Sequence, residues 1–273
     1  MRIANVAGQV KLVEGKLMRD VSGFSLADVY DRWDDFVEWA GGKDAAAAPS
    51  EPFDETRAGP PSPHPRQVFA VALNYSEHAA ETGVKAPDDP LFFTKFVSAF
   101  SGAHSTVTVP ESGNVDWETE LVAVIGREAR NVEGANGWDH VAGLTVGNDI
   151  SERNLQRSGP APQFSLAKSH IGFSPQGPTL VTPDELENRD DLALGCDLNG
   201  ESMQSSRTSH MIFSVPELVA YLSGILTLYP GDVIFTGTPP GVGAGRNPQV
   251  FIKPGDTLHT WIEGVGEMVQ KFC

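Results

Sequence analysis

Cysteine is scarce in this sequence, and its scarcity limits what the protein can be. Only Cys196 and Cys273 occur among 273 residues, so a disulfide framework is excluded. Neither cysteine belongs to a Cys-x-x-Cys pair, and we interpret both as structural. A chain of this kind suits a reducing compartment, and we predict a cytoplasmic location.

Positive charge is scarce as well. The chain has 20 lysines and arginines against 36 aspartates and glutamates, which gives a net charge of −16. Nucleic acids and anionic membranes are bound by clustered cations, so we predict neither as a partner. A small anionic substrate is compatible with this charge if cations are placed locally.

Long apolar runs are missing too. No run approaches the roughly 20 residues that cross a bilayer. Residues 1–8 lack the apolar core of a signal peptide. We therefore predict a soluble protein.

Several common catalytic signatures do not occur. Without Gly-x-Ser-x-Gly, a serine hydrolase of that type is excluded. The glycine-rich stretch 236–245 is not followed by Gly-Lys-Ser/Thr, and Pro239-Pro240 prevents a helix after it, which excludes the phosphate-loop and dinucleotide-binding motifs. Its glycines would instead let backbone N–H groups approach a ligand oxygen. The sequence contains no His-x-x-x-His motif of the kind that binds zinc.

The composition, 40% hydrophobic and 21% charged, predicts a packed core. We divide the chain into a small N-terminal domain with a proline-rich linker (1–62) and a catalytic domain (63–273). In the first part we expect strands over 2–6 and 9–21 and a helix that Ser25 caps and that runs to Ala40. The prolines between Lys43 and Arg66 predict a linker without regular structure.

The second part alternates buried strands with turn signals, which predicts a β-rich α+β fold. The expected elements are strands near 68–73, 121–125, 141–149, 233–235, 250–252, 257–262 and 266–269, and a hairpin over 191–208. Asn199-Gly200 marks the tip of the hairpin. Ser214 and Glu217 form a capping box for a core helix with Leu218, Val219, Leu222, Ile225 and Leu226 on its apolar face.

Three carboxylates stand at the ends of two of these strands. Glu118 and Glu120 are two positions apart, which on a strand turns both to the same face, and Asp149 closes the later strand 141–149. An all-oxygen set suits Mg²⁺ or Mn²⁺, with Ca²⁺ as an alternative. The other interpretation of the glutamates is a solvated pair at a strand end.

Other polar residues supply acid–base groups and cations. His78 and Glu81 are three apart, so a helical turn would let Glu81 orient His78 as a general base; the alternative is an exposed, solvated pair. A helix that begins at Asp149 would place Arg153 and Gln156 on its face. Lys95, Arg153 and Lys168 are the cations that could offset an anionic substrate.

Taken in order, these residues resemble the fumarylacetoacetate hydrolase superfamily, in its acylpyruvase and 2-hydroxyhepta-2,4-diene-1,7-dioate isomerase-like branch. The phrases that carry the resemblance are Asn74-Tyr75-x-x-His78-x-x-Glu81, Asp116-x-Glu118-x-Glu120-Leu121, Gly147-Asn148-Asp149-x-Ser151-x-Arg153-x-x-Gln156, Asn199-Gly200-Glu201-x-x-Gln204 and Pro230-Gly231-Asp232-x-Ile234-x-Thr236-Gly237-Thr238-Pro239. Five ordered phrases between residues 68 and 273 make a specific match.

The resemblance implies a mixed β-sandwich roll and a homodimer. It implies Mg²⁺ or Mn²⁺ on the three carboxylates and an acid–base dyad on a lid over the substrate. The implied catalytic residues are His78, Glu81 and Lys168. The implied contacts to a small anionic oxo-acid are Lys95, Arg153, Gln156, Gly237 and Thr238.

The implied reaction is metal-dependent hydrolysis of a C–C bond in an acylpyruvate or β-diketo acid through a metal-stabilised enolate, in the breakdown of aromatic compounds. Decarboxylation or isomerisation of an oxo-dicarboxylic acid is the alternative, and a non-catalytic binding protein is a third hypothesis. The chain departs from the family at His170, where an aspartate is usual, and at Leu144, where an aromatic residue is usual. Both departures concern the substrate and leave the carboxylates intact.

Overall fold

The apolar run after Glu120 forms β11 (Thr119–Ile125), and every residue of this strand is buried. The structure, a computed structural model, describes residues 1–81, 83, 85–111 and 113–273. β11 pairs antiparallel with β12 (Val141–Asn148) on one side and with β17 (Val233–Phe235) on the other. Apolar clusters also cover both faces of β11, so its residues do not alternate between apolar and polar.

β11 belongs to the larger sheet, whose strands run in the order β4-β3-β2-β1-β14-β12-β11-β17-β6-β7, with β5 beside β1 and β8 beside β14. The remaining members are β1 (Arg2–Val6), β2 (Gln9–Glu14), β3 (Leu17–Asp20), β4 (Ser50–Pro52), β5 (Ala58–Gly59), β6 (Val68–Ala72), β7 (Leu91–Thr94), β8 (Phe100–Ser101) and β14 (Ser174–Val181). Most pairs are antiparallel, whereas β17–β6 and β14–β8 are parallel.

A second sheet packs against the middle of the first. Its order is β16-β15-β18-β19-β9, with β9 (His104–Val107), β15 (Ala193–Leu198), β16 (Glu201–Arg207), β18 (Thr257–Ile262) and β19 (Gly266–Phe272). The short strands β10 (Val115–Asp116) and β13 (Ser151–Glu152) pair separately. The predicted hairpin is confirmed, and Asn199 and Gly200 at its tip both have positive φ. The β-rich α+β prediction is also confirmed.

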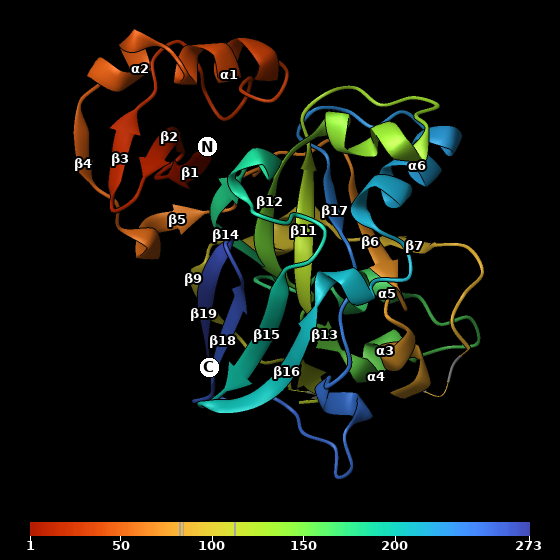
Figure 1. The fold of residues 1–273 in the computed structure, drawn as a ribbon. Coiled ribbons are helices and arrows are strands. Elements are labelled where there is room, and N and C mark those ends of the chain that lie inside the picture. Colours follow the sequence, from red (N-terminus) through yellow and green to blue (C-terminus); the bar gives the residue numbers. More distant parts are fainter. Residues whose placement is uncertain (82, 84, 112) are drawn as a thin grey trace.

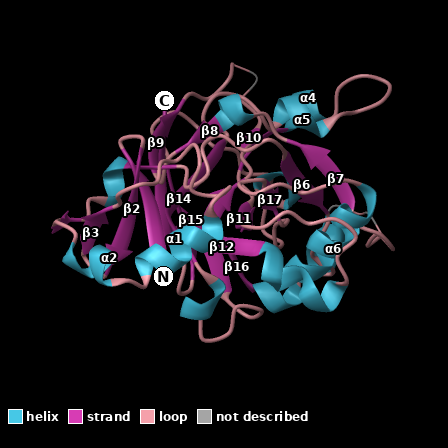
Figure 2. Ribbon diagram, turned by 90° about the horizontal axis from the view of Figure 1, so that it is seen from above, coloured by secondary structure: helices cyan, strands magenta, loops and turns pink. Residues whose placement is uncertain are grey.

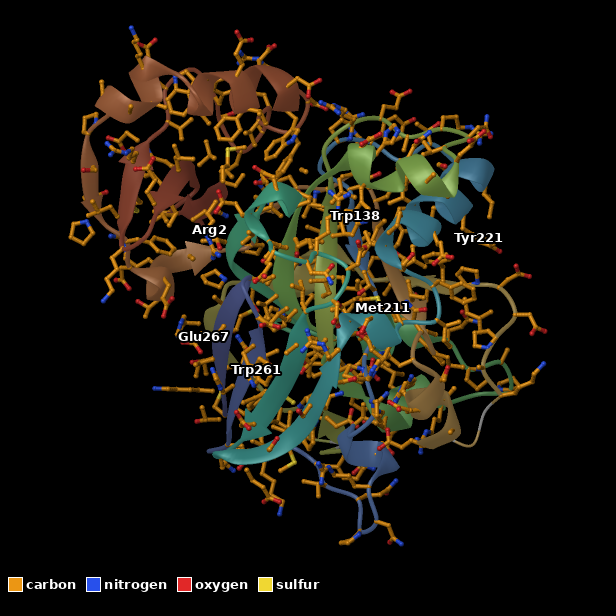
Figure 3. The ribbon with its side chains drawn as sticks, viewed as in Figure 1. Arg2, Trp138, Met211, Tyr221, Trp261 and Glu267 are labelled. Carbon is orange, nitrogen blue, oxygen red and sulfur yellow. The ribbon has the colours of Figure 1, made fainter. Side chains whose placement is uncertain are left out.

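Helices cover the edges of this sandwich (Figures 1 and 2). They are α1 (Trp33–Ala40), α2 (Lys43–Ala47), α3 (Ser76–Glu81), α4 (Arg153–Gln156), α5 (Phe164–Ala167) and α6 (Val215–Ile225). The capping box at the start of α6 is confirmed. Tyr221 of this helix, labelled in Figure 3, stacks on Phe92 of β7. The prediction that Ile225 packs in the core is wrong, since its side chain is 65% exposed at the last position of the helix. No described helix is both long enough and apolar enough to cross a membrane.

The N-terminal residues are joined to the larger sheet. β1 pairs with β14 through Arg2↔Val181 and Ile3↔Leu180, and Trp33 and Phe36 of α1 join the apolar cluster on one face of β11. In Figure 1 this part lies away from α3, α4 and α5. The division of the chain at residue 62 stays a prediction.

Two predictions for the N-terminal part are wrong. The helix begins at Trp33 rather than after Ser25. Asp28 does accept from the Ser25 N–H, as in a cap, but residues 26–32 form turns and not a regular helix. The segment 43–66 is not a plain linker. It contains α2, β4 and β5, and β4 is held by pairing with β3, a long-range contact that local composition does not show.

Two further predictions fail near the site. No helix begins at Asp149, since its N–H bonds to the Glu118 carbonyl at 2.8 Å and the chain stays extended to Glu152, which caps α4. Residues 250–252 form no strand. Two separate backbone hydrogen bonds hold them instead. The Val250 N–H donates to the Gly243 carbonyl, and the Ile252 N–H donates to the Val115 carbonyl.

Candidate metal and catalytic site

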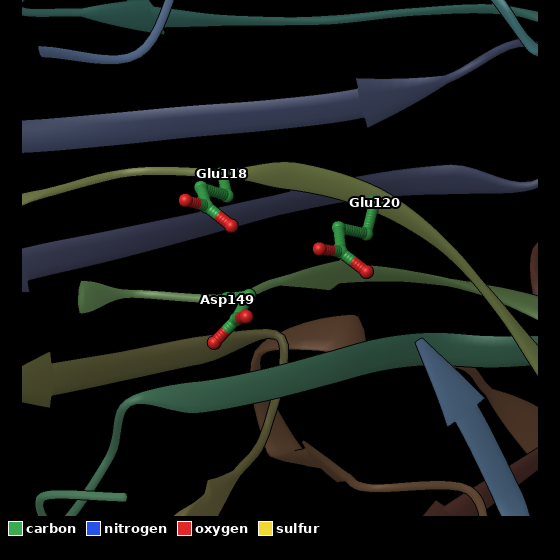
Figure 4. Close-up of side chains that lie close together, drawn as sticks. All are labelled: Glu118, Glu120 and Asp149. Atoms are coloured by element: carbon green, nitrogen blue, oxygen red, sulfur yellow. The ribbon is translucent and has the colours of Figure 1, made fainter. Parts of the chain in front are cut away.

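The register of β11 and β12 brings the three carboxylates together. Thr119 lies opposite Asn148, so the residues just outside this pair, Glu118 and Asp149, are neighbours. One oxygen from each of Glu118, Glu120 and Asp149 lies within 4.8 Å of the others, and all three residues are buried. Figure 4 shows the carboxylates turned toward a common point. The cluster is the only one of at least three potential metal ligands among the residues that the structure describes.

Cations surround two of the three carboxylates. Lys168 Nζ donates to Glu118 at 2.8 Å and to Asp149 at 2.6 Å, and Arg153 Nη2 donates to Glu118 at 2.7 Å. Lys95 Nζ donates to Asp149. Glu120 differs, since within the described part of the chain it has no ion-pair partner and accepts only the Gly237 N–H, at 2.8 Å.

This asymmetry sets the charge states. Burial opposes the charge of Glu118, but Lys168 and Arg153 outweigh it, so the pKa of Glu118 is lowered. Burial and the nearby charges of Asp149 and Glu118 raise the pKa of Glu120 well above its usual value. The site thus holds one carboxylate more than its own cations neutralise, and that carboxylate, Glu120, lies beside the other two ligands.

These residues fit a divalent ion. Three buried carboxylate oxygens within reach of one point form the hard, oxygen-only donor set that Mg²⁺, Mn²⁺ and Ca²⁺ prefer. Glu120 has no positively charged partner among the described residues, and such an ion would supply that positive charge. Neither cysteine nor histidine belongs to the cluster, so a zinc-type donor set is not formed by the described residues.

A buried aspartate that the sequence analysis did not assign to the site fixes Arg153. Asp116 accepts from Arg153 Nε at 2.6 Å and from the Ala244 N–H at 2.7 Å. Gln156 Oε1 accepts from Arg153 Nη1 at 2.8 Å. The guanidinium is therefore held by side chains from two segments, the stretch 116–118 and α4 itself. The available signal was the position of Asp116 two residues before Glu118.

Asp116→Asn should loosen this support. The substitution keeps the shape but removes the charge beside Arg153 and turns an amide toward the Ala244 N–H or the guanidinium, which are both donors. We expect kcat/KM to fall about 10- to 100-fold, as for other residues that position a ligand-binding group. Steady-state kinetics against Asp139→Asn, an exposed aspartate, would check this. Equal kinetics in the two variants would contradict the role of Asp116.

The predicted His–Glu pair forms on α3. His78 Nδ1 lies 3.2 Å from Glu81 Oε2, and the Gly241 N–H bonds to both Glu81 oxygens at 3.0 and 3.1 Å. Gly245 lies so close to Glu81 that a Cβ there would fall 2.6 Å from its carboxyl carbon. The glycines of 237–245 thus let backbone N–H groups reach the carboxylates of the site itself, Glu120 and Glu81. Nδ1 is engaged, and Nε2 has no hydrogen-bond partner among the residues that the structure describes.

A cavity of about 390 Å³ connects the pair with Glu118, one of the three carboxylates. Its polar lining includes His78, Glu81, Glu118, Arg153, Gln156, Lys168 and Thr238, and its apolar lining includes Val71, Phe93, Pro162, Phe164 and Val242. The charge of His78 also contributes to the lowered pKa of Glu118, after Lys168 and Arg153. The two candidate chemical groups therefore face one space.

Two residues predicted to touch the substrate lie behind the carboxylates. Lys95 is buried on Asp149 and on the backbone carbonyls of Lys168 and Phe173. The Gly237 N–H is taken by Glu120. Neither residue is part of the described cavity lining, so their contacts to substrate stay predictions. Arg157, which the sequence analysis did not consider, does line the cavity; its signal was its place four residues after Arg153.

Comparisons with known proteins find similar sequences and structures. The chain is 42% identical over 228 residues to "Oxaloacetate tautomerase FAHD2A, mitochondrial" of Bos taurus, which covers 83% of this chain and 73% of the relative. A crystal structure from Mycobacterium smegmatis, provisionally described as an HpcE protein, is 55% identical with a TM-score of 0.93 and covers 100% of this chain and 99% of that one. Fumarylacetoacetate hydrolase from Exiguobacterium antarcticum is 31% identical with a TM-score of 0.86, over 99% and 97% of the two chains.

A more distant structure holds a metal. Maleylpyruvate hydrolase from Sphingobium sp. SYK-6, in complex with manganese(II) and pyruvate, has the same fold, with a TM-score of 0.83 at 24% identity over 100% of this chain and 98% of that one. The fumarylacetoacetate hydrolase C-terminal family model matches residues 67–273. The relatives named above are enzymes, so the prediction of an enzyme with this sandwich fold is confirmed. This chain belongs to the fumarylacetoacetate hydrolase family.

Proposed function

We propose that the protein is a divalent-metal-dependent enzyme that interconverts the keto and enol forms of a 2-oxo acid, with an oxo-dicarboxylic acid of the oxaloacetate type as substrate. One observation carries the proposal. An oriented base, His78 with Glu81, lines the same cavity as Glu118, and Glu118 forms a carboxylate cluster with Glu120 and Asp149. The similarity to a named oxaloacetate tautomerase supports the choice of substrate.

In this proposal Glu118, Glu120 and Asp149 hold Mg²⁺ or Mn²⁺. The bound ion would supply positive charge that stabilises the negative charge developing on the oxo oxygen. Arg153 and Gln156, held rigidly against each other, would bind the carboxylate beside the oxo group, because a guanidinium matches a carboxylate in shape and charge.

His78 would carry the proton. Its Nε2 takes a proton from the carbon next to the oxo group, the electron pair of that C–H bond forms a C=C bond, and the oxo oxygen becomes negative. Lys168 Nζ, which lines the cavity, is the donor that we assign to this oxygen, and His78 and Lys168 exchange the proton through solvent. Return of the proton to carbon gives the keto acid again.

Hydrolysis of a C–C bond in an acylpyruvate is the second candidate, supported by the likeness to a fumarylacetoacetate hydrolase over nearly the whole chain. Here His78 takes a proton from water, the hydroxide attacks the distal carbonyl, and the C–C bond breaks with its electron pair left on the carbon next to the oxo group. Protonation of that carbon releases the oxo acid. Decarboxylation would use the same negative intermediate without the water.

Product analysis separates these reactions. Purified protein with Mg²⁺ or Mn²⁺ would be given oxaloacetate and a panel of acylpyruvates in H₂¹⁸O. Enol–keto conversion of oxaloacetate without CO₂ release or cleavage is the expected result. Cleavage with ¹⁸O in a product carboxylate would favour the hydrolase, and CO₂ release would favour the decarboxylase. Rates that do not depend on added metal would contradict the proposal.

Metal addition should also stabilise the protein. A ligand that binds only the folded state at about 100 times its Kd adds about 2.7 kcal/mol. In a chain of roughly this size about 1 kcal/mol shifts Tm by about 2 °C or more. Mg²⁺ or Mn²⁺ added to chelator-treated protein should therefore raise Tm by about 5 °C or more. An unchanged Tm at saturating metal would argue against a built site.

The family resemblance also leads us to propose a homodimer, and the scarcity of cysteine leads us to propose a cytoplasmic location. Light scattering after size-exclusion chromatography tests the first of these, with a mass near 58 kDa expected from about twice the 29.3 kDa chain. A mass of one chain would exclude it.

A further inference from the structure

The cations nearest the carboxylates are already engaged. Arg153 bonds to Asp116 and Glu118, and Lys168 bonds to Glu118 and Asp149. Lys95 is buried against Asp149. Apart from the His78–Glu81 pair, the site has four carboxylates and three cations. A divalent ion would leave it with one positive charge, which the carboxylate of a 2-oxo acid would neutralise.

A second substrate carboxylate would therefore need a further cation, and Arg157 is in the right place. It lines the same cavity as Arg153, Gln156 and Lys168. It follows α4 directly, where its N–H bonds to the carbonyls of Asn154 and Leu155. Arg153, Gln156 and Arg157 stand at positions i, i+3 and i+4, so one turn aims all three side chains to one side.

Arg157 is also free to bind. Its guanidinium has no hydrogen bond or ion pair with any other residue in the described ranges, whereas Arg153 beside it uses Nε and both Nη atoms. Pro162 and Phe164 line the cavity near it in sequence and provide an apolar wall. The cavity, at about 390 Å³, lies within the range of small-molecule sites.

We propose that Arg157 binds the distal carboxylate of the substrate and so selects dicarboxylic over monocarboxylic 2-oxo acids. The inference rests on the proposed function and refines it by naming the residue that selects the dicarboxylic substrate. Arg153 and Gln156 take the carboxylate next to the oxo group, and Arg157 takes the one at the other end. A planar guanidinium suits this task because it binds a carboxylate through two parallel N–H···O bonds.

Equilibrium binding tests the inference without turnover. Protein loaded with Mg²⁺ would be titrated calorimetrically with 2-oxoglutarate and with 2-oxopentanoate, which share a five-carbon chain but differ in the terminal carboxylate. Wild type should bind the dicarboxylate more tightly. Arg157→Gln should weaken its binding about 10- to 100-fold, the loss expected for hydrogen bonds between charged groups. Binding of 2-oxopentanoate should change less than about twofold.

Two variants and one assay complete the test. Arg57→Gln removes the same charge from an exposed position outside the cavity lining and should leave both affinities unchanged. Arg157→Lys should restore part of the preference. Equal binding of the two acids by wild type, binding of neither, or equal losses for both acids in Arg157→Gln would overturn the inference. Oxaloacetate turnover by wild type is measured separately, and its absence would refute the proposed function alone.

Discussion

Glu120→Gln should abolish metal binding and at the same time stabilise the metal-free protein. Glu120 is buried, has no ion-pair partner among the described residues, and its pKa is raised by burial and by Asp149 and Glu118. An acid whose folded pKa is raised destabilises the folded state at any pH where it must ionise there. A glutamine removes that charge, can still accept the Gly237 N–H, and offers an amide to the neighbouring carboxylates.

Metal affinity should move the opposite way. Loss of a direct carboxylate ligand should weaken Mg²⁺ or Mn²⁺ binding by more than the roughly 100-fold that loss of an outer partner causes. Turnover should fall at least about 10³-fold, because the charge that stabilises the reaction is lost with the ion. We expect the Tm of the chelator-treated variant to rise by about 2 °C or more, equivalent to about 1 kcal/mol.

Glu118→Gln is the matched control. It removes a ligand of the same type, but Glu118 is bonded to Arg153 and Lys168, and loss of one partner from a buried ion pair costs about 3–5 kcal/mol. Its metal-free Tm should therefore fall while its metal binding is lost as well. Calorimetric titration and thermal unfolding of both variants check the pair. Undiminished metal affinity in Glu120→Gln would refute the assignment of the site.

The elements that are predicted correctly from the sequence are those that depend on the local pattern of residues. The apolar run 121–125 is a fully buried strand, and Asn199-Gly200 is a hairpin tip, because each needs only its own residues to specify it. The convergence of Glu118 and Asp149 followed from their places at the ends of two strands. That these strands are neighbours came from the family resemblance and not from the residues alone.

The errors occur where distant contacts decide local structure. Residues 50–52 become a strand because β3 offers them an edge, although proline and charge in the segment disfavour regular structure. The chain after Asp149 stays extended because β10 pairs with Ser151 and Glu152, which postpones the helix to Arg153. The residue pattern of a segment does not show which distant strand will pair with it.

The site residues that were missed share one cause. Asp116 acts through Arg153, 37 residues later in the chain, and Arg157 is defined by a cavity whose walls come from several segments. Charge and residue type mark such positions as ordinary surface or strand residues. Only the folded chain shows that Asp116 is buried beside a guanidinium and that Arg157 lacks a partner in the described structure.

His78→Asn should stop turnover and leave the metal in place. His78 lies on α3 with Nδ1 against Glu81, and it belongs to no cluster of metal ligands in the described chain. Asparagine is similar in size but cannot take up a proton near neutral pH. We expect kcat to fall about 10²- to 10⁴-fold, the usual contribution of a general base. Affinity for Mg²⁺ or Mn²⁺ should change less than about twofold.

A variant of Glu81 distinguishes a catalytic role of His78 from a structural one. Glu81→Gln keeps a hydrogen bond to His78 Nδ1 but removes the charge that orients and supports it, so its loss should be smaller than that of His78→Asn and should come with a changed pH–rate profile. His64→Asn, at an exposed histidine outside the cavity lining, should behave as wild type. Parallel losses of metal affinity and turnover in His78→Asn would instead mean that His78 holds the cavity together, since a base that acts only on substrate has no reason to affect the ion.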